Sequence, residues 1–431
     1  MQDFEQVRSS GGITEYTLSA NGLTVLLMEE HSAPVATLMV TYRVGSRNEA
    51  IGHTGATHLL EHLMFKGSAD YNRDNGRSIW TVLQDVGAQL NATTWLDRTN
   101  YFEMLPSEHL ETAIAIEADR MRNAFIRDED RQSEMTVVRN EFERGENDPM
   151  EALEKNLWAT AYQAHPYHHS TIGWRSDIEG VATERLKAFY DTYYCPNNAT
   201  VTVIGDFDTG QTLAWISSHF GRHAASPEPI PEVYTTEPAQ EGPRRFIIKR
   251  AGEAGIVGLA HKSPPGLDTD KDALAVLGDI LGGGKTSRFY RALVDSGLAT
   301  SASAWDHPFR DNGLFIAYVF LTPDTPHDKG EAIILEIYQA IQDEGVTAQE
   351  VDRAKGQVRA QVAYSRDGSF AVAAALNEAI ATGDWTHYTT YQDRITAVTP
   401  EQVQSVARKY LQEDQSTTGW FIPLSGGKAA S

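Results

Sequence analysis

The sequence predicts an α+β fold built from two related units, and three observations support this prediction. The chain has 431 residues, which is too long for one ordinary core and suits two domains of about 200 residues each. Strand-like and helix-like stretches follow one another without strict β-α-β alternation. Prolines at high density between residues 226 and 243 would break both helix and sheet. We therefore expect domains at residues 1–225 and 244–431, joined by a proline-rich linker at residues 226–243.

The hydrophobic pattern predicts a similar succession of elements in the two halves. In the first half we expect strands at residues 23–27 and 35–40, helices at 58–65 and 78–86, a strand at 91–102 and a long helix at 129–163. In the second half we expect strands at 245–248 and 256–259, helices at 271–281 and 287–296, and a strand at 300–305. The shared rhythm indicates two copies of one α+β unit.

The composition is that of a soluble globular protein, with 41% hydrophobic and 22% charged residues. A formal charge of −22 makes nucleic acid an unexpected partner, because phosphate binding needs basic patches. No stretch approaches the roughly 20 apolar residues of a membrane span. No secretory signal is visible, which leaves cytoplasm and periplasm both open. Cys195 is the only cysteine, so we expect neither a disulfide nor a cysteine-based metal site.

The segment from His58 to His62 carries the clearest chemistry in the sequence, with the order H-x-x-E-H. Histidines four residues apart share one helix face and can both reach a Zn²⁺ at about 2.0–2.1 Å. Glu61 lies only about 60° round the helix from His58 and can hold a water as a general base. Such a match arises by chance in roughly a few per cent of chains this long. However, burying these polar groups on an apolar helix is costly unless a metal pairs them.

A catalytic zinc needs a third protein ligand, and the long helix expected at residues 129–163 offers two candidates. Glu134 and Glu141 are seven residues apart and share one helix face. One could bind the metal while the other orients a ligand. A solvated acidic helix is an equally good interpretation from the residues alone, because further acidic residues follow.

With these residues in place, the chain resembles the pitrilysin and mitochondrial-processing-peptidase family of inverzincin zinc peptidases. The resemblance rests on ordered motifs that cover nearly the whole chain, at residues 54–67, 87–94, 134–141, 193–198, 203–206 and 281–288. It implies two homologous α/β-sandwich domains, of which the first is catalytic and binds zinc and the second binds no metal. In this family, two chains of this size, or one of double length, enclose a chamber, so this chain would be half of a clamshell.

The resemblance also implies a role for each candidate residue. Three residues would be the ligands of one Zn²⁺ per chain: His58, His62 and Glu141. Glu61 would be the general base, and Glu134 would support a ligand. Asn91 and Ala92 match the edge-strand segment that pairs with the substrate backbone in this family. The implied activity is that of a zinc metalloendopeptidase acting on peptides or unfolded protein segments.

The chain departs from the family in its second half. Family members with a complete site carry an Arg and a Tyr seven residues apart around a Gly-Leu-Ala turn. The matching turn here, residues 297–299, places these two positions at Leu293 and Thr300. We therefore expect a homologous subunit to provide the pair in a heterodimer, with a homodimer as the alternative. The positions that match the first-half histidines and base are also unsuited to zinc: Ala275, Gly278 and Asp279.

Two further patterns in the sequence are better explained by structure than by chemistry. Residues 282–286 resemble a phosphate-binding loop, but position 279 is not glycine and no strand is expected before it. Residues 165–169 contain three histidines whose spacing fits no defensible zinc pattern, so we expect a surface loop.

Two other functions compete with general peptide degradation. The first is a non-catalytic, structural role, as in the core subunits of the respiratory bc1 complex. The second is the processing of targeting presequences. The intact set of candidate ligands argues against the first, and the sequence does not separate the second from general degradation.

Overall fold

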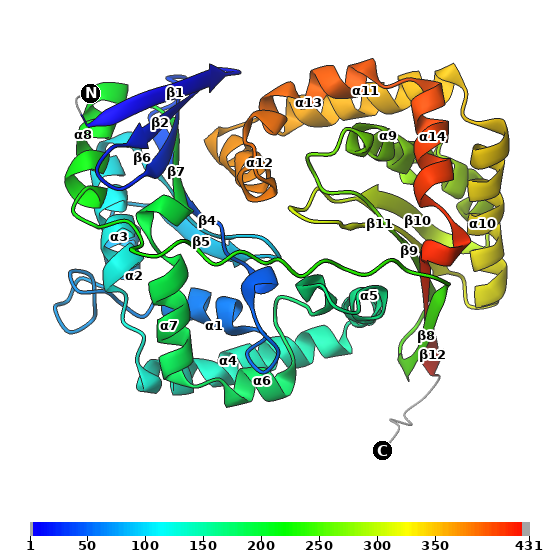
Figure 1. Cartoon of the computed structure of the whole chain (residues 1–431), viewed down its shortest axis with the longest axis horizontal. Helices are drawn as coiled ribbons and strands as arrows, with labels where there is room; N and C mark the ends of the chain where they lie inside the picture. The colour runs from blue at the N-terminus through cyan, green and yellow to red at the C-terminus, as the bar shows by residue number, and fades with distance from the viewer. Residues whose placement is uncertain (1–2, 425–431) are drawn as a thin grey trace. The chain divides into compact units, whose positions relative to one another are not determined.

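The computed structural model describes residues 3–424 and contains two mixed sheets surrounded by helices (Figure 1). The chain forms two compact units that are discontinuous in sequence. Unit 1 consists of the residues up to Phe142, His169–Tyr234 and Ser365–Thr389. Unit 2 consists of Glu143–His168, Thr235–Tyr364 and the residues from Thr390 onward. The mixed α/β fold predicted from the sequence is confirmed, but each unit takes one segment from the half of the chain assigned to the other.

Unit 1 is built on a seven-stranded sheet with the order β1-β2-β3-β7-β4-β6-β5. The strands are β1 (Phe4–Ser10), β2 (Ile13–Leu18), β3 (Leu23–Glu29), β4 (Val35–Tyr42), β5 (Gln89–Thr94), β6 (Thr99–Pro106) and β7 (Ala199–Gly205). Only β3 and β7 run parallel to each other; all other neighbours are antiparallel. In this order β5 forms one edge of the sheet.

Helices cover both faces of the unit 1 sheet. They are α1 (Ala56–Leu63), α2 (Ile79–Asp85), α3 (Leu110–Asn123), α4 (Asp128–Asn147, which continues into unit 2), α6 (Arg175–Gly180), α7 (Thr183–Tyr193), α8 (Thr209–Phe220) and α12 (Ser369–Thr382). Strand β4 explains the two layers, because its side chains alternate between faces. Leu38 packs in the core that includes α3, whereas Met39 packs against Leu376 of α12. Thr41 donates a hydrogen bond to Asn377 at 2.8 Å, which anchors α12 on the same face.

Unit 2 is built on a five-stranded sheet with the order β10-β11-β9-β12-β8. The strands are β8 (Arg244–Ala251), β9 (Ile256–Lys262), β10 (Ala299–Asp306), β11 (Leu314–Leu321) and β12 (Ser416–Leu424). Its helices are α5 (Pro149–Ala161), α9 (Asp270–Gly282), α10 (His327–Glu344), α11 (Ala348–Tyr364), α13 (Thr386–Ala397, which begins in unit 1) and α14 (Pro400–Tyr410), with a π-helical turn at Tyr290–Val294. Among the helices within residues 3–424, none combines the length and hydropathy needed to cross a bilayer.

The two sheets share one internal topology. In unit 1 the order β3-β7-β4-β6-β5 corresponds strand for strand to β8-β12-β9-β11-β10 in unit 2. The parallel pair also recurs at the same place, as β3 with β7 and as β8 with β12. A coincidence of order and direction over five strands is the structural signature of the repeat that the sequence predicts.

Two expected elements in the first half are each divided in two. The strand expected at residues 91–102 is a hairpin, because the chain turns at Trp95–Arg98 and the Trp95 N–H donates to the Arg98 carbonyl at 2.9 Å. The helix expected at residues 129–163 is interrupted at Asp148. The Asp148 carboxylate accepts hydrogen bonds from the backbone N–H groups of the next helix, and Pro149 occupies its first position. The helix expected at 287–296 is present only at residues 288–294, as two α-helical residues followed by a π-helical turn.

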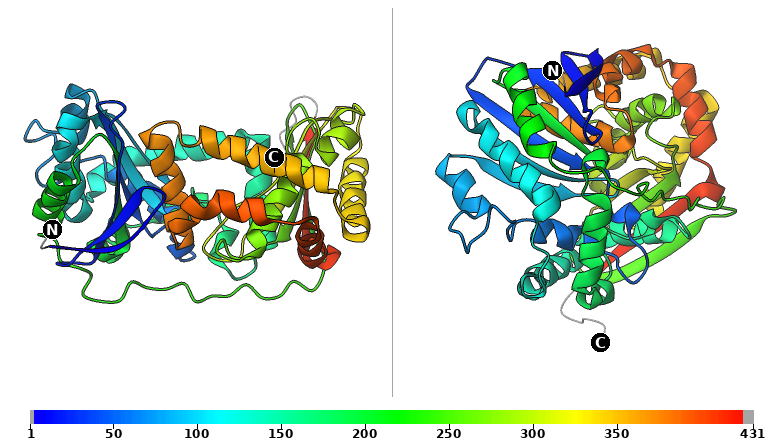
Figure 2. Two further views of the ribbon diagram at one scale, coloured as in Figure 1. Left: turned by 90° about the horizontal axis from the view of Figure 1, so that it is seen from above. Right: turned by 60° about the vertical axis from the view of Figure 1, so that its left-hand side comes forward.

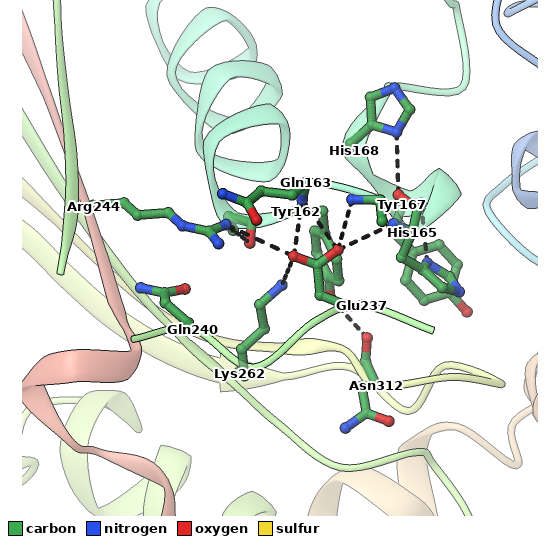
Figure 3. Close-up of polar contacts among 12 residues, drawn as sticks. Tyr162, Gln163, His165, Tyr167, His168, Glu237, Gln240, Arg244, Lys262 and Asn312 are labelled. Atoms are coloured by element: carbon green, nitrogen blue, oxygen red, sulfur yellow. Dashed lines mark hydrogen bonds and ion pairs between the residues drawn. The ribbon is translucent and has the colours of Figure 1, made fainter. Parts of the chain in front are cut away.

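Residues 221–243 form neither helix nor strand, as the proline pattern predicts (Figure 2). Within unit 2, Glu237 ties this linker to the turn after α5 (Figure 3). Its carboxylate accepts hydrogen bonds from the backbone N–H groups of Gln163, Ala164 and His165 at 2.8 to 3.1 Å. The ammonium group of Lys262 lies 3.8 Å from the same carboxylate. The predicted boundary at residue 225 lies within this segment and residue 244 begins β8, whereas the chain passes from unit 1 to unit 2 between residues 234 and 235.

Candidate metal centre

Helix α1 is fixed at its N-terminus by a buried carboxylate. Glu49 accepts hydrogen bonds from the backbone N–H groups of Gly55 and Thr57 at 2.8 and 2.7 Å. Gly55 has a positive φ of 84°, and a side chain there would collide with the carbonyl oxygen of Ile172. Burial raises the pKa of Glu49 to about 8, although the hydrogen bonds from Thr57 and Gly55 oppose the rise. These contacts set where the helix starts and therefore which way its side chains point.

The structure brings together the three residues predicted as ligands. Glu141 Oε2 lies 3.8 Å from His58 Nε2 and 3.7 Å from His62 Nε2. The three ligand atoms all lie within 4.8 Å of one another, and residues 3–424 contain no other such group of three or more metal-binding side chains. Ligands bound to a tetrahedral zinc at 2.0–2.1 Å lie about 3.3 Å apart. The separations here are wider than this value, but the three ligand atoms face one another and the mixed nitrogen and oxygen donor set suits zinc.

Apolar packing between α1 and α4 positions Glu141. Leu59 and Leu63 of α1 are buried in one cluster with Met135 and Val138 of α4. Glu141 lies one turn beyond Val138, and its side chain is 49% exposed. The packing of α4 on α1 therefore places the Glu141 carboxylate beside the two imidazoles and leaves it partly exposed.

The electrostatic environment favours the neutral form of His58, which is the form that binds metals. Burial, followed by the charge of His62, lowers the pKa of His58 to about 3. The two imidazole rings meet edge to face, with centroids 4.8 Å apart. The Nδ1 atom of His58 is buried and accepts or donates no hydrogen bond within the described residues.

Glu134 contacts the ring nitrogen of His62 that does not face Glu141. Its Oε1 lies 3.2 Å from His62 Nδ1, and its Oε2 forms an ion pair with Lys66. A hydrogen bond donated by Nδ1–H would leave the Nε2 lone pair free for a metal, and the supporting role of Glu134 remains a prediction. Burial acts to raise the pKa of Glu134, but the contacts with Lys66 and His62 outweigh it and lower the pKa. Lys66 was not among the predicted site residues; it lies in the turn that follows α1.

Glu61 lies beside the ligands and is only 9% exposed. Its Oε2 accepts a hydrogen bond from the Thr94 hydroxyl at 2.5 Å. Burial raises the pKa of Glu61, and the Thr94 hydrogen bond opposes this rise. A carboxylate with a raised pKa suits a general base, since proton transfer is most efficient when the pKa approaches the working pH. Thr94 also escaped prediction, although it ends the matched segment at residues 87–94.

Asn91 and Ala92 lie on β5, at the edge of the seven-stranded sheet. Within the described residues, β5 pairs only with β6, so one long side of the strand has no strand partner. Asn91 is exposed, and its side-chain oxygen accepts a hydrogen bond from the Ala92 N–H at 2.9 Å. The expected edge position is present, and pairing with a substrate remains a prediction.

The corresponding part of unit 2 is arranged for packing. Leu293 is fully buried in the unit 2 core, and the Thr300 hydroxyl donates to the Phe320 carbonyl at 3.3 Å. Burial raises the pKa of Asp279, on α9, to about 6. His165, from the histidine-containing loop, bonds to Asp311 at 2.9 Å. His165 and His169 are 4% and 2% exposed, so the surface loop expected at residues 165–169 is wrong: these two histidines are buried.

A duplicated α+β unit with an H-x-x-E-H helix facing a glutamate-bearing helix is the arrangement expected from the family resemblance. Comparison with known families agrees. Residues 24–174 match the family described as Insulinase (Peptidase family M16), and residues 181–358 match Peptidase M16 inactive domain. The chain belongs to peptidase family M16.

Several relatives are similar over nearly the whole chain. Zinc protease PqqE of Helicobacter pylori is 30% identical over 94% of this chain and 91% of that protein. The crystal structure of a protease from Helicobacter pylori has 28% identity and a TM-score of 0.90, covering 95% of this chain and 99% of that one. A probable mitochondrial-processing peptidase subunit beta from Arabidopsis thaliana is 26% identical over 95% of this chain and 78% of its own length.

Proposed function

We propose that this protein is a zinc metalloendopeptidase that hydrolyses peptides or unfolded protein segments. The observation that carries the proposal is the convergence of His58, His62 and Glu141 beside the buried carboxylate of Glu61. Relatives that bear the name zinc protease support the same activity. We propose one Zn²⁺ per chain, because the described residues contain one such cluster.

The chain's own residues have distinct tasks in peptide hydrolysis. When bound, zinc would lower the pKa of a coordinated water toward about 7 and polarise the scissile carbonyl. Glu61 would accept the proton of the attacking water and return it to the leaving amine. Glu134 and Lys66 would hold the imidazole of His62 in one orientation.

The substrate would add to the sheet as a further strand beside β5. An extended peptide can pair with the unpaired side of an edge strand through main-chain hydrogen bonds, which give affinity with little sequence preference. Asn91 and Ala92 would make these contacts in our proposal. This mode suits peptides and unfolded segments, since a folded substrate has no free backbone to offer.

We further propose that a homologous subunit completes the site in a heterodimer. The two positions matched to the substrate-holding Arg and Tyr are Leu293, which is buried, and Thr300, which has a short hydroxyl. A relative described as a processing-peptidase subunit beta is itself named as one part of an assembly. If a second copy of this chain served instead, it would bring the same two residues and no Arg/Tyr pair.

The proposal is tested by peptide hydrolysis with and without a zinc chelator, using wild type and Glu61→Gln. We expect chelator-sensitive turnover in the wild type. We expect Glu61→Gln to retain zinc and to lose about 100- to 10,000-fold in rate, the range that a general base contributes. Full turnover by Glu61→Gln, or turnover that survives removal of zinc, would contradict the proposal.

The subunit proposal needs a separate assay, in which this chain is tested alone and with homologous chains that carry the Arg/Tyr pair. We expect activity to rise on mixing and to fall again when the partner's Arg is replaced. Full activity of the isolated chain would contradict a heterodimer. An inert mixture in which this chain binds zinc would favour a structural role for the fold.

A further inference from the structure

We propose that Thr94 is a positioning residue for the general base. Its hydroxyl holds Glu61 so that one carboxylate oxygen is engaged and the other faces the attacking water. This inference rests on the proposed function, because it assigns a partner to the group that moves the proton. It links β5 to the general base on α1, whereas the three candidate metal ligands come from α1 and α4.

The contact between the two side chains is direct and short. The Thr94 hydroxyl donates to Glu61 Oε2 at 2.5 Å, within the distance range of charge-assisted hydrogen bonds between oxygens. Among the described residues, no other group forms a hydrogen bond with the Glu61 carboxylate. A glutamate side chain has several freely rotating bonds, so a single strong contact at one oxygen largely decides where the second oxygen lies. That second oxygen, Oε1, is then the one available to a proton.

Thr94 is itself held in place from the opposite face of β5. Its neighbour Thr93 points the other way, since successive side chains of a strand alternate. Arg98 donates to the Thr93 carbonyl at 3.1 Å and to its hydroxyl at 2.5 Å. Arg98 is buried and also pairs with Glu378 of α12 at 2.5 Å. These contacts of Arg98 fix the orientation of β5 and therefore the face of the strand from which the Thr94 hydroxyl points.

Thr94 could instead serve only as a strand-forming residue. Threonine and valine are both β-branched and both favour strands, whereas serine is a weaker strand former. A purely structural role would therefore rank valine close to threonine and serine below them. A positioning role requires the hydroxyl and predicts the opposite order. The two explanations are thus separated by the ranking of two substitutions at one position.

The test compares Thr94→Val and Thr94→Ser in the zinc-loaded full chain, together with its homologous partner if the isolated chain does not turn over. Steady-state kcat and KM, zinc content and the thermal midpoint are measured for each variant. We expect Thr94→Val to lower kcat by about 10- to 100-fold, the effect of losing a hydrogen bond to a charged group. KM and zinc content should stay at the wild-type values, and Thr94→Ser should remain within about threefold in kcat.

A matched control is Thr17→Val, which makes the same change on β2 in the same sheet and should leave kcat unchanged. If Thr94→Val does not fold, Thr94→Ala replaces it, and the contrast with Thr94→Ser still isolates the hydroxyl. Wild-type kcat in a folded variant without the hydroxyl, or a raised KM with unchanged kcat, would overturn the inference. A wild type with no chelator-sensitive turnover, or an active Glu61→Gln, would instead overturn the proposed function itself.

Discussion

The helix that follows the second strand of each five-stranded repeat shows how one scaffold serves two purposes. In unit 1 this helix is α1, between β4 and β5, and in unit 2 it is α9, between β9 and β10. Both helices pack apolar residues against their sheets. Only α1 carries two histidines and a glutamate, whereas α9 has alanine, glycine and aspartate at the matched positions. The two units thus share one backbone topology, but only the helix of unit 1 carries metal-binding side chains.

The contrast extends to the charged clusters of the two units. Glu141 in unit 1 is 49% exposed, and its nearest partners are two imidazole nitrogens more than 3.5 Å away. Glu237 in unit 2 is 8% exposed, and three backbone N–H groups saturate its carboxylate. A carboxylate with unfilled coordination can accept a ligand, whereas a saturated one fixes the chain. Charge alone therefore does not distinguish a site from a structural anchor.

The largest expected effect is on zinc affinity, when matched positions of the two equivalent helices are each replaced by alanine. His62→Ala on α1 should lower zinc affinity by more than about 1,000-fold, because it removes a ligand. Asp279→Ala on α9 is the matched control and should leave zinc affinity unchanged. Competition with a zinc-binding dye measures both. Equal losses of zinc affinity in the two variants would contradict the claim that only α1 binds the metal.

Glu141→Gln should have the next largest effect on zinc affinity, a loss of about 100-fold or more, since an amide is a poorer ligand than a carboxylate. Glu143→Gln, two residues further along α4, changes the same charge outside the cluster. We expect its zinc affinity to match the wild type. If both variants lose zinc affinity equally, the overall negative charge of α4 attracts the metal and Glu141 is not a specific ligand.

Lys66→Met should weaken zinc binding or turnover by about 10- to 100-fold, because it leaves Glu134 without its ion pair and loosens the orientation of His62. Lys187→Met on α7 removes an exposed lysine and is the control. Calorimetric zinc titration compares the zinc affinities of the two variants with that of the wild type. Wild-type binding by Lys66→Met would show that Glu134 needs no support.

The smallest expected effect concerns stability and belongs to unit 2. Glu237→Gln should lower the free energy of unfolding by about 1–3 kcal/mol, the range for hydrogen bonds to a charged group. Zinc binding should not change. Glu232→Gln, at an exposed position of the same linker, is the control. A thermal midpoint equal to the wild type would show that the linker is not anchored by this carboxylate.

The same substitution has a pH signature. Burial acts to raise the pKa of Glu237, but hydrogen bonds from the backbone of Ala164, His165 and Gln163 outweigh it, so the folded-state pKa lies below the ordinary 4.5. The stabilisation is therefore complete above pH 4.5 and is lost as the pH falls through the folded-state pKa. The difference in stability between wild type and Glu237→Gln should shrink over that interval. A difference that grows on acidification would contradict this assignment.

Most of the fold was predictable from the sequence, because hydrophobic periodicity and turn residues act locally. The strands β3, β4 and β10 and the helices α1, α2 and α9 lie where the pattern places them. The hairpin at residues 89–106 was predicted as one strand, since its turn contains Trp95 and Leu96 in place of the usual glycine or proline. The exchange of residues 143–168 and 365–389 between units was not predictable, because it depends on long-range packing.

The candidate site was predictable to the extent that its residues share a motif. His58, Glu61 and His62 lie on one helix turn, and spacing alone suggests their chemistry. Helix spacing offered Glu134 and Glu141 as candidates, and the resemblance chose Glu141, which lies within 3.8 Å of both histidines in the structure. Thr94 and Lys66 lie within matched segments, but neither residue type by itself suggests a role in the site. Their contacts with Glu61 and Glu134 exist only after β5 and α4 have packed beside α1.

The most direct test of the account is anomalous X-ray scattering at the zinc absorption edge, recorded from crystals of the full chain. The account predicts one anomalous peak bounded by His58 Nε2, His62 Nε2 and Glu141 Oε2, at about 2.0–2.1 Å from each. No peak should lie at the α9 positions of unit 2. A crystal grown with zinc that shows no peak at this cluster, or a peak only elsewhere, would contradict the central claim.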